Sequence, residues 1–331
     1  MKMKKFINNP DTLTDELLEG MELANHDIVE VRGHMVISRA LAGADRVTIV
    51  TYGGSGHEPA QHGFVGEGMT DIHVVGYIFA SPSPQPVFEA VKLADKGHGV
   101  LLLTLNHAGD MLTGNMVMKM VEKEGLNVRK VITQEDISNA PRSNSDDRRG
   151  LAGAIPLYHI AAAAAREGKS LDEVADIAQK YADSMATIAV AARCATHPAT
   201  GAEFGDLGDI DMEIGMGQHG EGGGGRQPMK TAKETIEIMA NALVKDIPLV
   251  KGDKAFVMIN GSGSTTLMEQ WILYKDCVHY LESLGIEVVA NMVGEILTVQ
   301  EQAGFQLNIA KWDDVTLARW NTPAHTIAFN K

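Results

Sequence analysis

Short runs of β-branched residues in this chain alternate with longer stretches whose apolar positions recur with the period of a helix. The apolar runs at residues 47–50, 100–105 and 128–133 predict strands, and the segment 86–96 carries apolar residues on one face of a predicted helix. The run 100–105 is apolar at nearly every position, which indicates a strand covered on both faces. This alternation of strands and helices predicts an α/β fold.

The same pattern continues after an alanine-rich stretch. Residues 155–192 predict helices, with Ser170 and Glu173 forming a capping box at the start of one of them. Further elements follow along the chain: a helix at 231–244, a strand at 255–260, a helix ending near 284, and strands near 286–293 and 305–309.

A Gly- and Pro-rich, irregular segment at residues 194–228 predicts a junction between domains. We therefore expect two α/β lobes, each a central sheet flanked by helices, with the boundary at residue 190: residues 1–190 form the first lobe and 191–331 the second. A chain of 331 residues agrees with two lobes, because a single core seldom grows beyond about 250–300 residues.

The charge of the chain narrows the range of partners. Its formal net charge is −14, so its surface repels nucleic-acid phosphates and anionic lipid. The N-terminus has lysines but no apolar signal-peptide core behind them, and no apolar run approaches the ~20 residues of a membrane span. We expect no nucleic acid and no membrane as partners, and a cytoplasmic location.

Polar residues follow two of the predicted strands. His57 stands in the glycine-rich turn after residues 47–50, and Asp110 stands in the turn after 100–105. Ligands of open α/β sheets bind where strands end, so His57 could donate a hydrogen bond to a substrate and Asp110 could accept a proton from a hydroxyl. A turn histidine and a helix-capping aspartate remain alternatives. The turn Gly53–Gly56 matches neither common nucleotide-binding motif.

A glycine-rich stretch surrounds His219. Seven glycines occur within the twelve residues from Gly215 to Arg226, and ordering so many glycines costs much backbone entropy. His219 is therefore expected to be presented to a ligand, and its imidazole could attack a carbonyl carbon or bind a metal. No second ligand stands at a metal-binding spacing, so no metal site is expected. A flexible surface loop remains an alternative. The pair Arg148 and Arg149 could bind an anion or, as we favour, balance the charges of Asp146 and Asp147.

In combination these motifs resemble the K subunit of dihydroxyacetone kinase, the ketose-binding subunit, over essentially the full chain. The resemblance rests on motifs in matching order: residues 53–59, 79–84, Asn106 with Gly109 and Asp110, 148–150, 212–217, 219–221 and 320–326. It implies that His219 forms a covalent hemiaminal with the ketone carbon, that Asp110 takes the proton of the terminal hydroxyl, and that His57 hydrogen-bonds the substrate. Implied substrate-binding residues are Gly53, Gly54, Ser55, Leu105, Asn106 and His107.

The resemblance also implies partners. No cofactor is expected on this chain, because it ends where ATP-using relatives continue into a nucleotide-binding domain. ADP or ATP with Mg²⁺ is expected on a separate L-type subunit, recharged by an M-type subunit of the phosphotransferase system or by exchange with ATP. A homodimer is implied as well.

Departures from the family pattern concern the ketose. The family commonly has glycine, lysine, tyrosine and threonine where this chain has Tyr52, Leu105, His107 and Ala108. The loss of a lysine removes a charge, so the hypothesis is a related ketose such as a tetrulose (erythrulose) or a modified triose. A non-catalytic ketose sensor that activates a transcription regulator is the alternative function. Retention of His57, Asp110 and His219 favours the enzyme.

Overall fold

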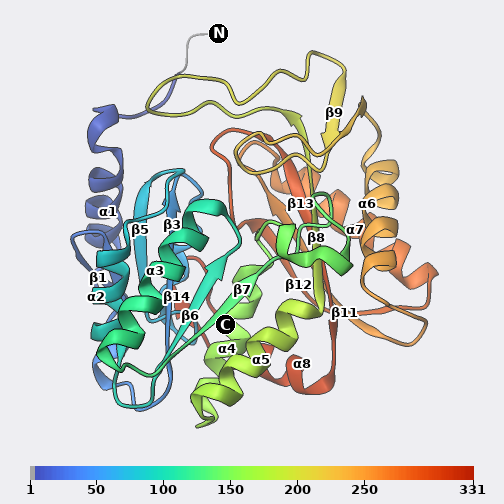
Figure 1. The fold of residues 1–331 in the computed structure, drawn as a ribbon. Coiled ribbons are helices and arrows are strands. Elements are labelled where there is room, and N and C mark those ends of the chain that lie inside the picture. Colours follow the sequence, from blue (N-terminus) through green and yellow to red (C-terminus); the bar gives the residue numbers. More distant parts are fainter. Residues whose placement is uncertain (1–3) are drawn as a thin grey trace. The chain divides into compact units, whose positions relative to one another are not determined.

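The structure, a computed structural model, describes residues 4–331 (Figure 1). Within that range the strands form two six-stranded sheets and one two-stranded sheet. Contacts divide the chain into an N-terminal unit (Phe6–Thr133, Ala154–Ala182 and Ala318–Lys331) and a C-terminal unit (Gln134–Gly153 and Asp183–Leu317, with the described residues before Phe6). Each unit has a large sheet flanked by helices, which confirms the predicted α/β class.

This division differs from the single boundary expected at residue 190. Residues Gln134–Gly153 belong to the C-terminal unit, and Ala154–Ala182 return to the N-terminal one. The segment 194–228, expected to be a junction, lies inside the C-terminal unit. Composition did not reveal this, because an ordered loop and a linker can be equally rich in glycine.

The sheet of the N-terminal unit is mixed. Its strands run in the order β1 (Val29–Arg32), β2 (Met35–Ser38), β5 (Ile72–Ile78), β3 (Thr48–Ser55), β6 (Val100–Leu105) and β7 (Val128–Thr133). Its helices are α1 (Leu13–Ala24), α2 (Pro84–Ala94), α3 (Ala108–Glu124), α4 (Ala154–Arg166) and α5 (Leu171–Asp183), and β4 (Gly66–Glu67) pairs with β14 (His325–Thr326). Since β3 is parallel to β5 and to β6, these strands end at one edge of the sheet.

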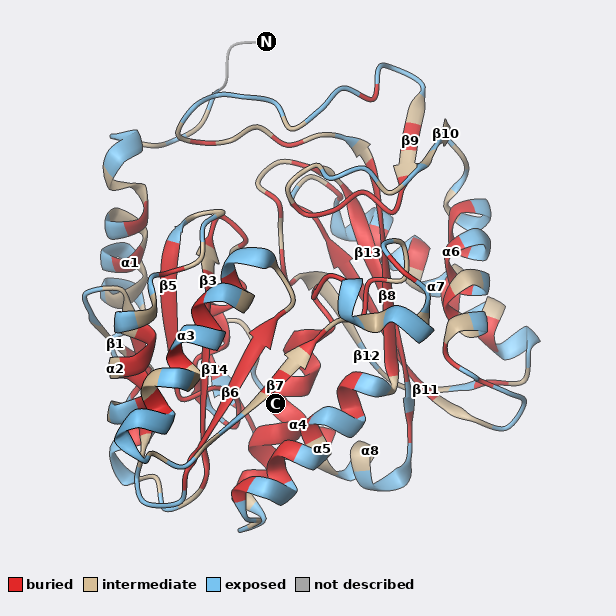
Figure 2. Ribbon diagram, viewed as in Figure 1, coloured by how far each residue is buried: buried red, intermediate tan, exposed pale blue. Residues whose placement is uncertain are grey.

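The sheet of the C-terminal unit is mostly antiparallel. Its order is β10 (Gly225–Pro228), β9 (Asp211–Ile214), β8 (Met185–Arg193), β13 (Ala303–Trp312), β11 (Lys254–Gly261) and β12 (Glu287–Glu295). Helices α6 (Ala232–Asp246) and α7 (Leu267–Ser283) pack on it through Met239, Leu243, Leu273 and Leu281, and α8 (Asp314–Trp320) follows β13. In Figure 2 strands β8, β11 and β13 are mostly buried, β12 is mostly of intermediate exposure, and α6 is exposed on its outer face.

Local sequence signals account for several of these elements. All six residues of β6 are buried, as its continuous apolar pattern predicted. The Ser170–Glu173 capping box is present at α5: the Glu173 N–H donates to the Ser170 hydroxyl oxygen at 3.4 Å, and the Ser170 N–H donates to the Glu173 carboxylate at 2.9 Å. The helix predicted up to residue 192 is wrong in its last part, because residues Met185–Arg193 form the buried strand β8. No helix within residues 4–331 is both long and apolar enough to cross a membrane.

Glu135 is a buried acid in the C-terminal unit. It is 1% exposed, Leu151 N–H donates to its Oε1 at 2.9 Å, and among the described residues its Oε2 has no hydrogen-bond partner. Burial raises the pKa of Glu135 from 4.5 to about 8. Between these two pH values the folded protein therefore binds a proton that the unfolded chain lacks, and stability falls as the pH rises.

We expect Glu135→Gln to flatten this dependence. The amide can still accept from Leu151 but does not ionise, so the free energy of unfolding should fall less between pH 5 and pH 8 than in the unchanged protein. Urea unfolding at several pH values measures this free energy. Glu237→Gln, on the exposed face of α6, is the matched control. If the free energy of unfolding changed with pH in the same way in Glu135→Gln and in the unchanged protein, Glu135 would not be the group that binds the proton.

Candidate active site

His57 and Asp110 lie at the same edge of the N-terminal sheet. Strands β3 and β6 are paired in parallel, with Thr51 opposite Leu103, and His57 follows the end of β3. Asp110 lies in the first turn of α3, just after β6. Each of the two residues is only 8% exposed. The structure thus brings these two candidates to the carboxyl ends of neighbouring strands, as predicted.

The His57 ring packs on an aromatic side chain. Its centroid is 4.9 Å from that of Phe79, with 56° between the ring planes. Gly56 makes this packing possible, because its φ is +98° and a Cβ there would lie 2.8 Å from the Phe79 ring. Phe79 itself has a φ of +55°, which is uncommon for a bulky residue. The imidazole is therefore positioned by packing as well as by its turn.

The turn at the end of β3 is packed tightly against its own chain. A Cβ on Gly53 would lie 2.8 Å from Gln61 Nε2, and a Cβ on Gly54 would lie 2.7 Å from the backbone N of Ala80. Ser55 is fully buried, and its hydroxyl is 3.0 Å from that of Thr14 in α1. The protein's own packing thus requires Gly54, where the close contact is with backbone, whereas at Gly53 the close contact is with the end of the Gln61 side chain.

Leu105, Asn106 and His107 connect β6 to α3. Leu105 is 3% exposed, and Asn106 N–H donates to the carbonyl of Thr133 at 3.0 Å. His107 is the N-cap residue of α3, and its carbonyl accepts from Met111 N–H at 2.8 Å. This connection places Asp110 at the N-terminal end of a helix, where the helix dipole favours a carboxylate.

His219 lies in the C-terminal unit, in the loop that joins the antiparallel strands β9 and β10 (Figure 2). The Glu221 carboxylate contacts His219 at two points. The backbone N–H of His219 donates to Glu221 Oε2 at 2.9 Å, and His219 Nδ1 is 3.3 Å from Glu221 Oε1. The side chain of His219 is 29% exposed. A carboxylate beside Nδ1 favours the tautomer with the proton on that nitrogen, which leaves the lone pair on Nε2.

A charged network extends from Glu221 into the unit. Arg149 Nη1 is 3.8 Å from Glu221 Oε2, and Arg149 Nε donates to the buried Asp136 at 2.8 Å. A Cβ on Gly217 would lie 2.1 Å from Arg149 Nη1 and 2.2 Å from Glu221 Oε2, so a larger residue would displace the side chains of this network. Arg149 forms its ion pairs with Asp136 and Glu221 rather than with the expected Asp146 and Asp147, and Arg148 forms one with Asp246.

The charge state of Glu221 follows from these contacts. Burial acts to raise the pKa of Glu221, but the hydrogen bonds from the His219 ring and backbone outweigh it and lower the pKa to about 2. Glu221 is therefore a carboxylate at every pH at which the protein would be assayed. Spacing along the chain did not single out Glu221, Arg149 and Asp136 as a group.

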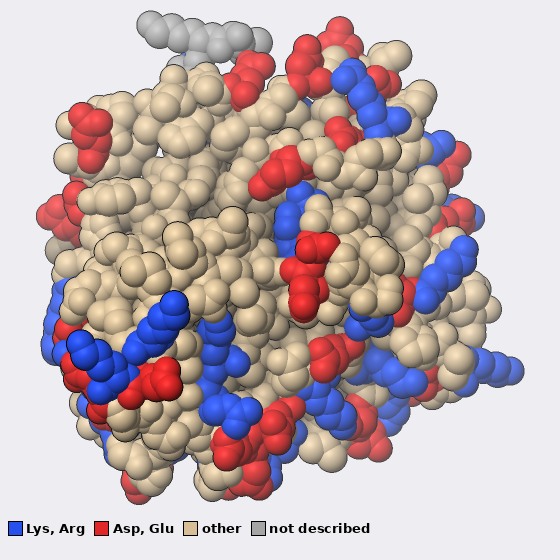
Figure 3. Space-filling model, in the orientation of Figure 1, with Lys and Arg blue, Asp and Glu red and all other residues tan. Residues whose placement is uncertain are grey.

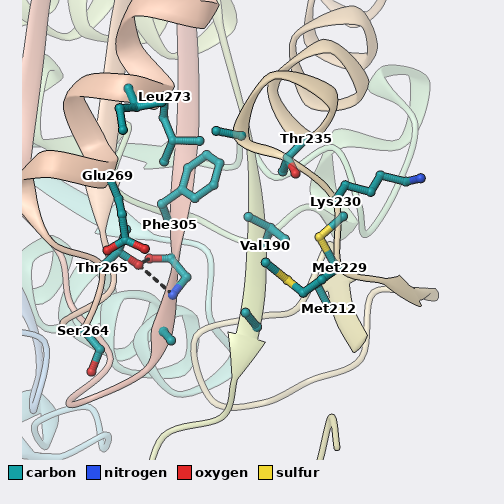
Figure 4. Close-up of a pocket in the computed structure, with 15 residues that line it drawn as sticks. Val190, Met212, Met229, Lys230, Thr235, Ser264, Thr265, Glu269, Leu273 and Phe305 are labelled. Atoms are coloured by element: carbon teal, nitrogen blue, oxygen red, sulfur yellow. Dashed lines mark hydrogen bonds between the residues drawn. The ribbon is translucent and has the colours of Figure 1, made fainter. Parts of the chain in front are cut away.

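Among residues 4–331, no three or more His, Cys, Asp or Glu side chains are grouped to hold a metal ion. A largely apolar pocket of about 210 Å³ lies between α6, α7 and the strands β8 and β13 (Figure 4). The hydroxyl of Thr265 in its wall donates to the carbonyl of Gly304 at 2.6 Å, and His219 is not among its lining residues. On the face in Figure 3, basic side chains lie among acidic ones in several places.

The chain matches the Dak1 domain over residues 19–328. It is also 37% identical over 331 residues to the PTS-dependent dihydroxyacetone kinase, dihydroxyacetone-binding subunit DhaK, of Lactococcus lactis, covering 99% of this chain and 100% of that relative. The chain belongs to the Dak1 family. The resemblance inferred from the motifs of this Dak1 protein is thereby confirmed.

Two further relatives differ in what their names say they do. The dihydroxyacetone kinase operon co-activator Dha-DhaQ has a structure with a TM-score of 0.90 and 28% identity, covering 96% of this Dak1 protein and 98% of that chain. The L-erythrulose kinase of Pectobacterium atrosepticum is 34% identical over 336 residues. That alignment covers 99% of this Dak1 protein but 56% of the kinase.

Proposed function

We propose that this Dak1 protein is the ketose-binding subunit of a two-component kinase and that it holds a short ketose as a covalent hemiaminal on His219. The observation that carries the proposal is the double hydrogen bond from His219 to Glu221, which directs the ring proton to Nδ1. The similarity to a dihydroxyacetone-binding subunit over the full chain supports it.

The addition step uses the lone pair on His219 Nε2. A bond forms between Nε2 and the ketone carbon, the π bond of the carbonyl breaks, and its electron pair moves to the oxygen, which takes a proton from solvent. The ring gains positive charge as the bond forms, and the Glu221 carboxylate beside Nδ1–H stabilises that charge. Polyols such as glycerol have no carbonyl and cannot form this bond.

The transfer step uses residues of the N-terminal unit. Asp110 takes the proton of the terminal hydroxyl as the oxygen attacks the phosphoryl group, and His57 donates a hydrogen bond to the substrate. Substrate contacts come from Gly53, Gly54, Ser55, Leu105, Asn106 and His107. A separate L-type subunit holds ADP or ATP with Mg²⁺ and is recharged by an M-type phosphotransferase-system subunit or by ATP exchange. The subunit itself acts as a homodimer.

The preferred ketose in this proposal is a tetrulose. Leu105 offers an apolar side chain with no hydrogen-bond donor, and it is buried at the end of β6. His107 and Tyr52 change the polarity and size of the surroundings relative to the family pattern. The similarity to a protein named L-erythrulose kinase agrees with this choice.

A kinase assay with an L-type subunit tests the substrate. We expect phosphorylation of dihydroxyacetone and of D- and L-erythrulose, with faster turnover of a tetrulose and none of glycerol. Equal or faster turnover of dihydroxyacetone than of every tetrulose would refute the altered specificity. Absence of phosphoryl transfer to every ketose would refute the kinase proposal itself, and absence of a covalent adduct with every ketose would refute the hemiaminal on His219.

A ketose-sensing co-activator of a transcription regulator is the second candidate function. The structural similarity to the co-activator Dha-DhaQ favours it. A sensor needs the adduct on His219 but no proton transfer by Asp110. The same assay separates the two functions, because a sensor would form the adduct and bind a regulator without transferring phosphate.

A further inference from the structure

Tyr52 connects strand β3 to the first turn of α3. It is fully buried, and its hydroxyl donates to the backbone carbonyl of Asp110 at 2.8 Å. The same oxygen is 3.0 Å from the hydroxyl of Thr104 on β6. A single hydroxyl thus joins β3, β6 and the turn of α3 that carries Asp110.

Helix α3 has a matching gap for this hydroxyl. An added Cβ on Gly114 would lie 2.3 Å from the Tyr52 oxygen but 3.5 Å from the adjoining ring carbon, Cζ. Gly114 lies in the interior of the helix, where glycine is less favourable than alanine. The glycine is therefore explained by the space that the hydroxyl needs.

The hydroxyl remains a donor under all assay conditions. Burial raises the pKa of Tyr52, and the nearby Asp110 carboxylate raises it further, against the opposing effect of the bond to Thr104. Tyr52 is therefore neutral and keeps its proton. The bond to the Asp110 carbonyl does not depend on pH in the working range.

We propose that Tyr52 is a positioning residue for Asp110. Tyr52 directly precedes the Gly53–Gly54 turn, so its hydroxyl sets the distance between that turn and the helix turn that carries the carboxylate. This inference rests on the proposed function, in which the turn contacts the ketose and Asp110 accepts its proton. Displacement of a reacting group by about 1 Å can lower a rate by about 10²-fold, so loss of this bond affects catalysis.

Tyr52→Phe tests the positioning role, because it removes only the hydroxyl. We expect kcat to fall by roughly 10-fold to 100-fold with KM within about two-fold, and the ketose adduct on His219 to form as before. Val117→Ala, which removes buried methyl groups from the same helix, is the control for lost stability. Wild-type kcat in Tyr52→Phe, or an equal fall in kcat in Val117→Ala, would overturn the inference.

Gly114→Ala tests the same contact from the helix side. Its methyl group collides with the Tyr52 hydroxyl, so kcat should fall. In the double variant Tyr52→Phe/Gly114→Ala the nearest ring carbon is 3.5 Å away, and kcat should equal that of Tyr52→Phe alone. Additive losses in the double variant would show that the two positions act independently and would overturn the inference.

Hydrogen exchange separates this inference from the proposed function. If the unchanged protein transfers no phosphate, the proposed function fails, but the contact between Tyr52 and α3 can still be judged. Amide exchange in residues 108–114 should then be faster in Tyr52→Phe than in the unchanged protein. Unchanged exchange in that peptide would overturn the positioning role whatever the activity.

Discussion

Replacement of His219 with alanine should abolish the covalent ketose adduct. The unchanged protein, mixed with a short ketose, should gain the full mass of the ketose in an intact-protein mass spectrum, because a hemiaminal forms without loss of water. The His219→Ala variant has no ring nitrogen to add to the carbonyl and should gain nothing. Its discrimination between ketoses and polyols should weaken for the same reason.

A histidine on another element gives the control for this variant. His279 is exposed on α7, so His279→Ala should leave the adduct intact. The loop around His219 is held by backbone contacts as well as by the ring, and Gly217 N–H still donates to the carbonyl of Glu221 in the variant. An adduct of the same amount in His219→Ala would show that another group traps the ketone.

Replacement of Asp110 with asparagine should separate binding from transfer. The amide is close in shape to the carboxyl but accepts no proton, so phosphoryl transfer should fall by roughly 10²–10⁴-fold, as for loss of a general base. The adduct on His219 should still form, because addition to the carbonyl does not use Asp110. Turnover is measured in the coupled kinase assay, and the adduct by mass spectrometry.

The matched control is a carboxyl-to-amide change on the same helix. Glu122 is exposed in the last turns of α3, and Glu122→Gln should keep both turnover and the adduct. Turnover at the unchanged level in Asp110→Asn would remove Asp110 from the role of base. Loss of the adduct together with turnover would indicate a structural role instead.

The elements predicted well from the sequence are those with strong, uninterrupted patterns. Strands β6 and β7 begin and end where the apolar runs do, and the capping box placed the start of α5 correctly. Strand β8 was missed because its Thr and Val residues lie between alanines that continue the preceding helical stretch. Alanine is common in helices but fits a tightly packed central strand as well.

The candidate site was predictable only where its chemistry is local. His57, Asp110 and His219 stand beside glycine-rich turns that can be read along the chain. The network from Asp136 through Arg149 to Glu221 joins residues up to 85 positions apart, and no spacing rule connects them. Tyr52 and Gly114 are likewise linked only by the fold, through the gap that one leaves for the other.

The position of residues Gln134–Gly153 in the C-terminal unit has a consequence for how such proteins could recombine in evolution. An exchange of gene halves near residue 190 would cut through β8 and would carry His219 and Glu221 away from Arg149 and Asp136. In the recombined protein the loop between β9 and β10 would lack the charged side chains of Arg149 and Asp136 that stabilise it. We therefore expect His219 and the early segment that supports its loop to be inherited as one piece.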